Sequence, residues 1–269
     1  MSKKIAIIGC GWFGLPLAKL LIEKGYLVNG TTTSRDKIEM LSNSKINPFV
    51  LELSENSISK SITEVLNNVD VAVINIPPGL RRQPNKNYAG QMAQFVPYLE
   101  NSGVKHVLYI SSTSVFEDDE TFPIILDNTS PNGKNYSAQQ LIKTELQFQN
   151  SSYFTTTILR FSGLIGNDRH PAHSLSGRKN ISNPMAPINL IHLKDCINIS
   201  KLIIKNDVWN ETFNAASNFH PSKIDYYTQA CENFRIPRPE FNIQEKNVGK
   251  IINSEKLVQK LNYKIDKPI

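Results

Sequence analysis

Short apolar runs alternate with segments of helical periodicity over the first 160 residues of the chain. The runs are almost continuously apolar, which is typical of parallel strands covered on both faces. They predict strands at residues 5–8, 26–31, 48–53, 69–76, 105–111 and 155–161. Spacing of apolar positions predicts helices at 15–24, 36–41, 88–101 and 136–149. Strands and helices that alternate in this way predict an α/β fold, a Rossmann-type doubly wound parallel sheet.

The pattern changes after Arg160. Residues 162–190 are rich in Gly, Pro, Asn, Ser and His and show little periodicity, which is typical of a cap that shapes a pocket. A helix at 193–204 and a strand at 212–214 are expected to return to the sheet. We therefore predict a Rossmann-type domain and a small C-terminal substrate lobe. The domain is expected at residues 1–161 with 191–216, and the lobe at 162–190 and 217–269.

Three glycines follow the first apolar run with the spacing G-x-G-x-x-G, and a helical pattern begins directly after them. Gly9 allows a tight turn, Gly11 leaves room for a pyrophosphate, and Gly14 lets the helix pack closely on the strand. Amide groups and the positive dipole end at the start of such a helix bind phosphate. The turn, including Trp12 and Phe13, is therefore predicted to bind a dinucleotide, with both aromatic rings packing against the cap or the sheet.

Composition limits the other function classes. The chain has 269 residues, a formal net charge of +6 and a sequence pI near 9.1. Its lysines are scattered, so we expect a solvated basic surface and no nucleic-acid partner. Three distant cysteines indicate neither a disulfide framework nor a metal site and favour a reducing compartment. The N-terminal apolar stretch is interrupted by glycines and Lys19, so we expect no signal peptide, no membrane span and a cytoplasmic protein.

The end of the second predicted strand bears on the choice of cofactor. NAD-selective folds place a carboxylate there for the ribose 2′-hydroxyl. This chain instead has Thr33, Ser34 and Arg35, and the first carboxylate is Asp36. Hydroxyls followed by a guanidinium suit a 2′-phosphate, so NADP is preferred over NAD. The alternative is that Arg35 only begins a solvated helix.

A third candidate segment ends the fourth predicted strand. Asn75, Ile76 and Pro77 begin the run Asn-Ile-Pro-Pro-Gly. Doubly wound folds bind ligands at the carboxyl edge of the sheet, so this backbone is predicted to line the cofactor. A rigid structural turn is the alternative interpretation.

Several segments together resemble the extended short-chain dehydrogenase/reductases, the NAD-dependent epimerase/dehydratase family, and in particular its atypical YeeZ-like branch. The resemblance covers nearly the whole length in the family's order, although no single piece is decisive. The matching segments are residues 9–14, 109–116, 158–166, 188–195, 214–216 and 256–263.

The resemblance implies a catalytic pair. Ser112 would orient the reacting substrate oxygen and Tyr136 would transfer the proton. The family's Tyr-x-x-x-Lys pattern is broken, because position 140 is glutamine. Gln140 is able to bind a ribose hydroxyl but brings no charge to lower a tyrosine pKa. In the other possible register, Ser137 and Leu141 occupy the tyrosine and lysine positions, and the lysine is again missing.

The resemblance also implies that Glu52 and Leu53 lie near the adenine and that a homodimer is possible. We therefore expect an NAD(P)-binding oxidoreductase or epimerase-like protein that acts on a small polar substrate such as a sugar or nucleotide-sugar. The alternative is a catalytically inactive NAD(P)-binding sensor or scaffold protein.

Overall fold

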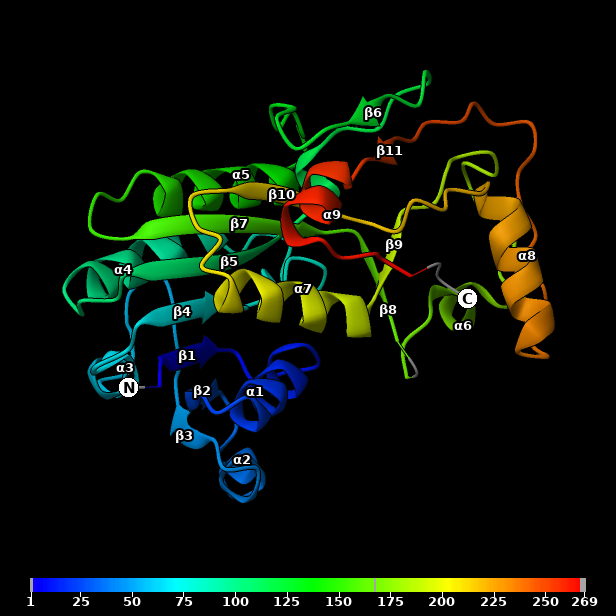
Figure 1. Cartoon of the computed structure of the whole chain (residues 1–269). Helices are drawn as coiled ribbons and strands as arrows, with labels where there is room; N and C mark the ends of the chain where they lie inside the picture. Colours follow the sequence, from blue (N-terminus) through cyan, green and yellow to red (C-terminus); the bar gives the residue numbers. More distant parts are fainter. Residues whose placement is uncertain (1, 167, 267–269) are drawn as a thin grey trace. The chain divides into compact units, whose positions relative to one another are not determined.

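The computed structural model describes residues 2–166 and 168–266 and contains a seven-stranded sheet (Figure 1). The strand order is β10-β7-β5-β4-β1-β2-β3. From β1 the chain adds β2 and β3 on one side of the sheet and then returns to add β4 and the later strands on the other side of β1. The strands are β1 (Lys4–Ile8), β2 (Leu27–Thr32), β3 (Asn47–Val50), β4 (Val71–Ile74), β5 (His106–Ser112), β7 (Thr155–Phe161) and β10 (Thr212–Ala215).

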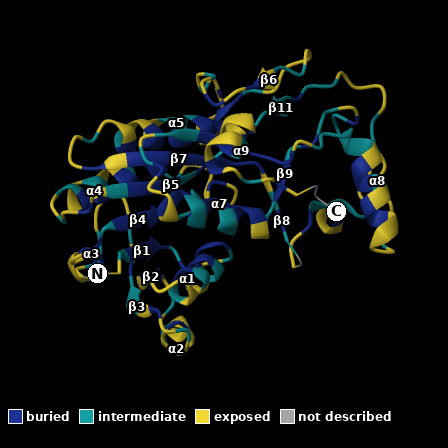
Figure 2. Ribbon diagram, in the orientation of Figure 1, coloured by how far each residue is buried: buried dark blue, intermediate teal, exposed yellow. Residues whose placement is uncertain are grey.

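The central strands pair in parallel and are buried. β1 pairs with β2 on one side and with β4 on the other, and Ile7 lies opposite Gly30 and Val73. All four residues of β4 are fully buried and apolar. Figure 2 shows the same strands in the buried class. This arrangement confirms the predicted Rossmann-type parallel sheet, whose two faces are both covered.

Helices cover the sheet on both faces. Figure 1 shows α4 and α5 together on one face and α1 on the other. Asn87 and Asn135 cap α4 and α5, because their side chains accept from the amides of Gly90 and Ala138. The helices are α1 (Gly14–Glu23), α2 (Ile38–Asn43), α3 (Ile62–Leu66), α4 (Tyr88–Glu100), α5 (Tyr136–Gln149), α6 (Pro171–Leu175), α7 (Leu193–Lys205), α8 (Lys223–Asn233) and α9 (Glu255–Leu261).

The chain divides into two compact units. The first unit contains residues 1–112, 134–159 and 197–212, and the second contains 113–133, 160–196 and 213–269. Strands β7 and β10 begin in the first unit and end in the second. The domain boundaries expected from the sequence stay a prediction.

Short elements build the second unit. The two-residue strands β6 (Ile124–Ile125) and β11 (Ile251–Ile252) pair in parallel, and β8 (Gly163–Ile165) pairs with β9 (Leu190–His192). Around Tyr226, Tyr227 and Cys231 of α8, a small apolar cluster includes residues of β8, α6 and β9.

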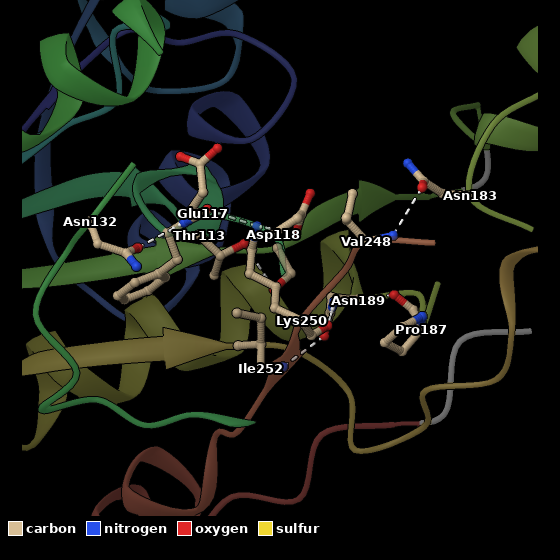
Figure 3. Close-up of polar contacts among 12 residues, drawn as sticks. Thr113, Glu117, Asp118, Asn132, Asn183, Pro187, Asn189, Val248, Lys250 and Ile252 are labelled. Atoms are coloured by element: carbon tan, nitrogen blue, oxygen red, sulfur yellow. Dashed lines mark hydrogen bonds and ion pairs between the residues drawn. The ribbon is translucent and has the colours of Figure 1, made fainter. Parts of the chain in front are cut away.

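Polar side chains hold the loops of the second unit together (Figure 3). Asn189 accepts from Ile252 N at 2.8 Å and donates to Lys250 O at 2.8 Å. The ammonium of Lys250 donates to Phe116 O at 2.8 Å and to the Asp118 carboxylate at 2.7 Å, and its side chain is only 12% exposed. Segments far apart in the sequence are thus joined by side chains where regular ladders are short.

Most predicted elements lie within a residue or two of their observed bounds, including the short strands β1 and β10. The predicted helix 136–149 and strand 155–161 have the observed bounds. The predicted third strand was too long, because β3 ends at Val50 and the chain then turns into an antiparallel bridge between Leu53 and Ile58. The predicted helix 36–41 begins as a 3₁₀ turn at Arg35–Lys37 and continues as α2.

The described residues contain no helix long and apolar enough to cross a membrane. Over the same residues, no group of three or more His, Cys, Asp or Glu side chains is arranged to hold a metal ion. All three cysteines are buried, and none of them forms a disulfide.

Candidate dinucleotide-binding site

The turn between β1 and α1 contains three glycines, two of which have no room for a side chain. Gly9 has φ +109°, and a Cβ there would lie 2.5 Å from Asn75 O. A Cβ on Gly14 would lie 2.1 Å from Gly9 O, so the helix packs directly on the turn. At Gly11, by contrast, a Cβ would meet no heavy atom within 4 Å. Two glycines therefore shape the turn and the third leaves open space beside it.

Neighbouring strand ends brace this turn. Gly9 N donates to Thr31 Oγ1 at 2.9 Å, and Cys10 N donates to Thr31 O at 2.7 Å. From the other side, Asn75 Nδ2 donates to Gly9 O at 3.1 Å. Burial raises the pKa of the Cys10 thiol to about 12, so this cysteine stays protonated at neutral pH. The ends of β1, β2 and β4 thus meet at one rigid turn.

The start of α1 is suited to an anion. Phe13 is the N-cap residue, and its own side chain makes no capping hydrogen bond. The Phe13 ring is buried, Trp12 is half-buried and Gly11 is exposed; contact of the two aromatic residues with a cofactor stays a prediction. A ten-residue helix carries a positive partial charge at this end, directly beside the open space at Gly11.

The predicted 2′-phosphate residues follow β2 directly. Thr33 and Arg35 are exposed and Ser34 is half-buried, in extended conformation at the start of the 3₁₀ turn. Ser34 N donates to Thr32 Oγ1 at 3.2 Å, which fixes the chain direction there. The hydroxyls and the guanidinium are therefore accessible at the carboxyl end of β2. Their contact with a cofactor stays a prediction.

The segment predicted near the adenine lies beyond β3. Glu52 is exposed, and its amide donates to Ser59 Oγ at 2.8 Å. The carbonyl oxygen of Leu53 accepts from Gln91 Nε2 at 2.5 Å, which connects this segment to α4. The sequence analysis missed Gln91, which holds the end of the β3 segment in place.

Both predicted catalytic residues lie in the first unit, at the ends of elements. Ser112 is the last residue of β5 and is half-buried. Tyr136 is the first residue of α5, is 47% exposed, and donates from its hydroxyl to Lys86 O at 3.3 Å. Ser137, the alternative in the other register, is also exposed, whereas Leu141 is buried. The choice between the two registers stays open.

Gln140 contacts α4 in this structure. It is 4% exposed, and its Oε1 accepts from Ala89 N at 2.8 Å. Gln147, two turns further along α5, donates to Ala89 O at 3.1 Å. Glutamine at position 140 therefore ties the first turn of α4 to α5. Its predicted contact with a nicotinamide ribose stays a prediction.

A buried polar network, not foreseen from the sequence, lies behind Ser112. Ser111 Oγ donates to Glu145 Oε1 at 2.6 Å, and both residues are almost fully buried. The hydroxyls of Tyr88 and Tyr109 lie 3.4 Å apart, and Tyr88 OH also donates to Ile76 O at 2.9 Å. Burial raises the pKa of both tyrosines, so they remain neutral. These contacts fix the ends of β4 and β5 against α4 and α5.

A dinucleotide diphosphate fits these residues. Two observations support this fit: a side chain at Gly11 would fill open space, and the positive end of α1 lies beside that space. Gly9 and Gly14 shape the turn, while the residues after β2 and β4 flank it.

Comparisons with known proteins agree with this geometry. The family described as the NAD-dependent glycerol-3-phosphate dehydrogenase N-terminus matches residues 4–102. Protein YeeZ of Escherichia coli K12 is 27% identical over 268 residues, which cover 99% of this chain and 97% of that protein.

Solved structures share the fold. UDP-N-acetylglucosamine 4-epimerase from Bacillus cereus is 16% identical with a TM-score of 0.77, over 99% of this chain and 92% of the other. A UDP-glucuronic acid 4-epimerase from Bacillus cereus, solved in complex with NAD, is 16% identical with a TM-score of 0.77, over 98% and 92%. The chain is thus similar to YeeZ over nearly the whole length of both proteins, and it shares its fold with solved sugar-nucleotide epimerases.

Proposed function

We propose that this protein is an NAD(P)-dependent oxidoreductase or epimerase that acts on a small polar substrate of the sugar or nucleotide-sugar class. The observation that carries the proposal is the glycine turn, in which Gly9 and Gly14 admit no side chain and Gly11 faces open space. The printed names of the structural neighbours, which include sugar-nucleotide epimerases, support the substrate class.

NADP is the preferred cofactor in this proposal. Thr33, Ser34 and Arg35 would hold the 2′-phosphate, because a guanidinium binds phosphate through paired hydrogen bonds. Glu52 and Leu53 would lie along the adenine. Asn75, Ile76 and Pro77 would lie along the middle of the cofactor. When bound, the nicotinamide supplies or accepts a hydride.

Ser112 and Tyr136 would serve the substrate. Ser112 would donate a hydrogen bond to the reacting oxygen, and Tyr136 would transfer the proton at its hydroxyl. In this structure that hydroxyl donates to a backbone carbonyl, so it must leave Lys86 O before it transfers a proton to substrate. A homodimer is part of the same proposal.

Calorimetry with NAD and NADP tests the proposal. We expect binding of both, tighter for NADP, and loss of that preference in Arg35→Ala. A panel of nucleotide-sugars then tests for turnover, followed at 340 nm for an oxidoreductase and by chromatography of the sugar product for an epimerase, whose nicotinamide returns to its starting state in each cycle. Absence of binding to either dinucleotide would refute the whole proposal, whereas activity that is unchanged in Ser112→Ala would refute only the assigned chemistry.

A second candidate is a dinucleotide-binding sensor or scaffold without catalysis. Gln140 favours this candidate, because position 140 holds an uncharged residue where the resemblance leads us to expect a lysine. The carboxamide oxygen of Gln140 accepts a hydrogen bond from Ala89 N. Dinucleotide binding that alters association with a partner protein, without turnover of any nucleotide-sugar, would support this candidate over the enzyme.

A further inference from the structure

Lys86 lies in the first unit, in the segment that joins β4 to α4. It directly precedes Asn87, the N-cap of α4. Its Nζ lies 5.9 Å from the centroid of the Tyr88 ring and 3.9 Å from the position that a Cβ on Gly79 would take. Gly79 belongs to the turn that follows β4. The side chain therefore runs back along the segment at the carboxyl edge of the sheet.

No anion neutralises this ammonium at short range. Within residues 2–166 and 168–266, Lys86 Nζ makes neither a hydrogen bond nor an ion pair. Glu55 attracts it only over a longer distance, because both oxygens of that carboxylate accept from Asn87, at 3.1 and 3.2 Å. Burial lowers the pKa of Lys86, and Glu55 partly opposes this shift. A half-buried cation of this kind gains from a bound anion.

Hydrogen bonds connect the surroundings of Lys86 to both parts of the candidate site. Lys86 Nζ lies over the ring of Tyr88, and the Tyr88 hydroxyl donates to Ile76 O. The adjacent Asn75 donates to Gly9 O in the glycine turn. The main-chain carbonyl of Lys86 accepts from Tyr136 OH at 3.3 Å. Lys86 therefore borders the segment that meets the glycine turn and also the predicted proton donor.

We propose that Lys86 Nζ binds a phosphate group at the carboxyl edge of the first unit. It would thereby supply a positive charge to the ligand that the uncharged Gln140 does not supply. A lysine ammonium acts as a compact point charge with three donors, which suits a phosphate oxygen. The phosphate belongs either to the dinucleotide or to a nucleotide-sugar substrate. The inference rests on the proposed function.

Binding titrations with matched variants test this. Lys86→Met keeps the apolar stem over Tyr88 and removes the charge, and Lys86→Arg restores it. Lys143→Met removes a lysine that is exposed on α5 and is the control. Each protein is titrated by calorimetry with NADP, NAD and UDP-glucose at low salt. We expect Lys86→Met to weaken one of the two ligand classes by about 10-fold or more, as loss of a charge-assisted hydrogen bond does.

The outcomes separate the two phosphate sources and the two proposals. Weaker dinucleotide binding assigns Lys86 to the cofactor phosphate, and weaker binding of UDP-glucose alone assigns it to the substrate phosphate. Lys86→Arg should bind within about threefold of wild type, and Lys143→Met like wild type. If wild type binds and Lys86→Met binds equally tightly, the inference is wrong while the proposed function stands. If wild type binds neither class, the proposed function itself fails.

A second variant guards against loss of folding. Lys86→Gln removes the same charge with a polar side chain that tolerates exposure. If Lys86→Met unfolds, the titrations are repeated with Lys86→Gln and the same fold-change is expected. Thermal unfolding without ligand should be unchanged in the variant used. Unchanged affinity in a folded Lys86→Gln protein would overturn the inference.

Discussion

Each of the two units is stabilised internally by a different kind of interaction. In the first unit, long strands bury continuous apolar residues, and all four residues of β4 are inaccessible to solvent. In the second unit, the two-residue strands β6 and β11 form only a short pair, and the side chains of Asn189 and Lys250 bond to backbone atoms of distant segments. Apolar burial is spread over many atoms, whereas a side-chain bond is a single contact.

This difference indicates where each unit is sensitive to substitution. In the first unit, a conservative apolar substitution changes only a small part of the buried area and should lower the free energy of unfolding little. The position most sensitive to substitution there is the glycine turn. In the second unit, the vulnerable points are individual polar groups that have no substitute nearby. The candidate ligand-binding residues all lie in the first unit, so binding and second-unit stability are separately testable.

Gly14→Ala should have the largest effect on stability. The added Cβ would lie 2.1 Å from Gly9 O, so the backbone of the turn or of α1 must move. We expect a loss of about 3 kcal/mol in the free energy of unfolding, measured by urea titration, because overpacking against backbone is costly. Dinucleotide binding should be lost as well.

Gly11→Ala is the matched control for this prediction. Its Cβ meets no heavy atom within 4 Å, so the free energy of unfolding should change by less than about 0.5 kcal/mol. Dinucleotide affinity should still fall, because the methyl group enters the space assigned to the diphosphate. Equal stability of the two variants would contradict the geometry described for the turn.

Lys250→Met tests the second unit. It removes the bonds to Phe116 O and Asp118 from a side chain that is 12% exposed, and it leaves a backbone carbonyl without this donor. We expect a loss of about 2 kcal/mol, because hydrogen bonds to charged groups contribute that much. Hydrogen exchange should accelerate in residues 113–133 and 245–255.

Lys246→Met is the control for Lys250→Met. Lys246 pairs with Glu120 at 3.1 Å, but both side chains are more than half exposed. Exposed pairs contribute little, so the variant should unfold like wild type. If hydrogen exchange of the Lys250→Met variant accelerated as much in β1 and β4 as in the second unit, the proposed difference between the units would not hold.

The same difference explains what the sequence could predict. The pattern of α5 and β7 is local, and both elements were predicted with their observed bounds. The glycine turn was predicted because the spacing of Gly9, Gly11 and Gly14 is local, although the contact that excludes a side chain at Gly9 is with the distant Asn75. Local periodicity and local sterics are visible in one sequence without knowledge of tertiary contacts.

Contacts between distant segments could not be predicted in this way. Nothing in the sequence indicates that Gln140 meets Ala89 or that Ser111 meets Glu145, since each pair is brought together only by the packing of helices on the sheet. Strands of two residues, such as β6 and β11, are too short for periodicity.

Helix α8 is a different kind of omission. Ser222 caps it by accepting from Asp225 N at 3.2 Å, and this Ser-x-x-Asp spacing is a known sign of a helix start. The signal was present in the sequence and the prediction did not use it. The missed helix is therefore an error of interpretation, whereas the missed polar contacts depend on tertiary structure.

The smallest predicted effect is a dependence of second-unit stability on pH. In that unit, His170 Nδ1 accepts from Ala172 N at 3.2 Å, so Nε2 carries the proton and donates to Tyr226 OH at 3.0 Å. Burial lowers the pKa of His170, and His173 adds to this shift. The unfolded chain therefore binds a proton first as the pH falls below the ordinary histidine value of about 6.5.

Stability should consequently be full above about pH 6.5 and decrease as the pH falls toward the lowered pKa of the folded state. One histidine contributes a slope of at most about 1.4 kcal/mol per pH unit in that window. His170→Gln should reduce the slope of the unfolding midpoint between pH 7 and 5. His106 of the first unit also has a pKa lowered by burial, so His106→Gln is the companion variant. If only His106→Gln reduced the slope, the first unit would be the more acid-sensitive one, contrary to this comparison.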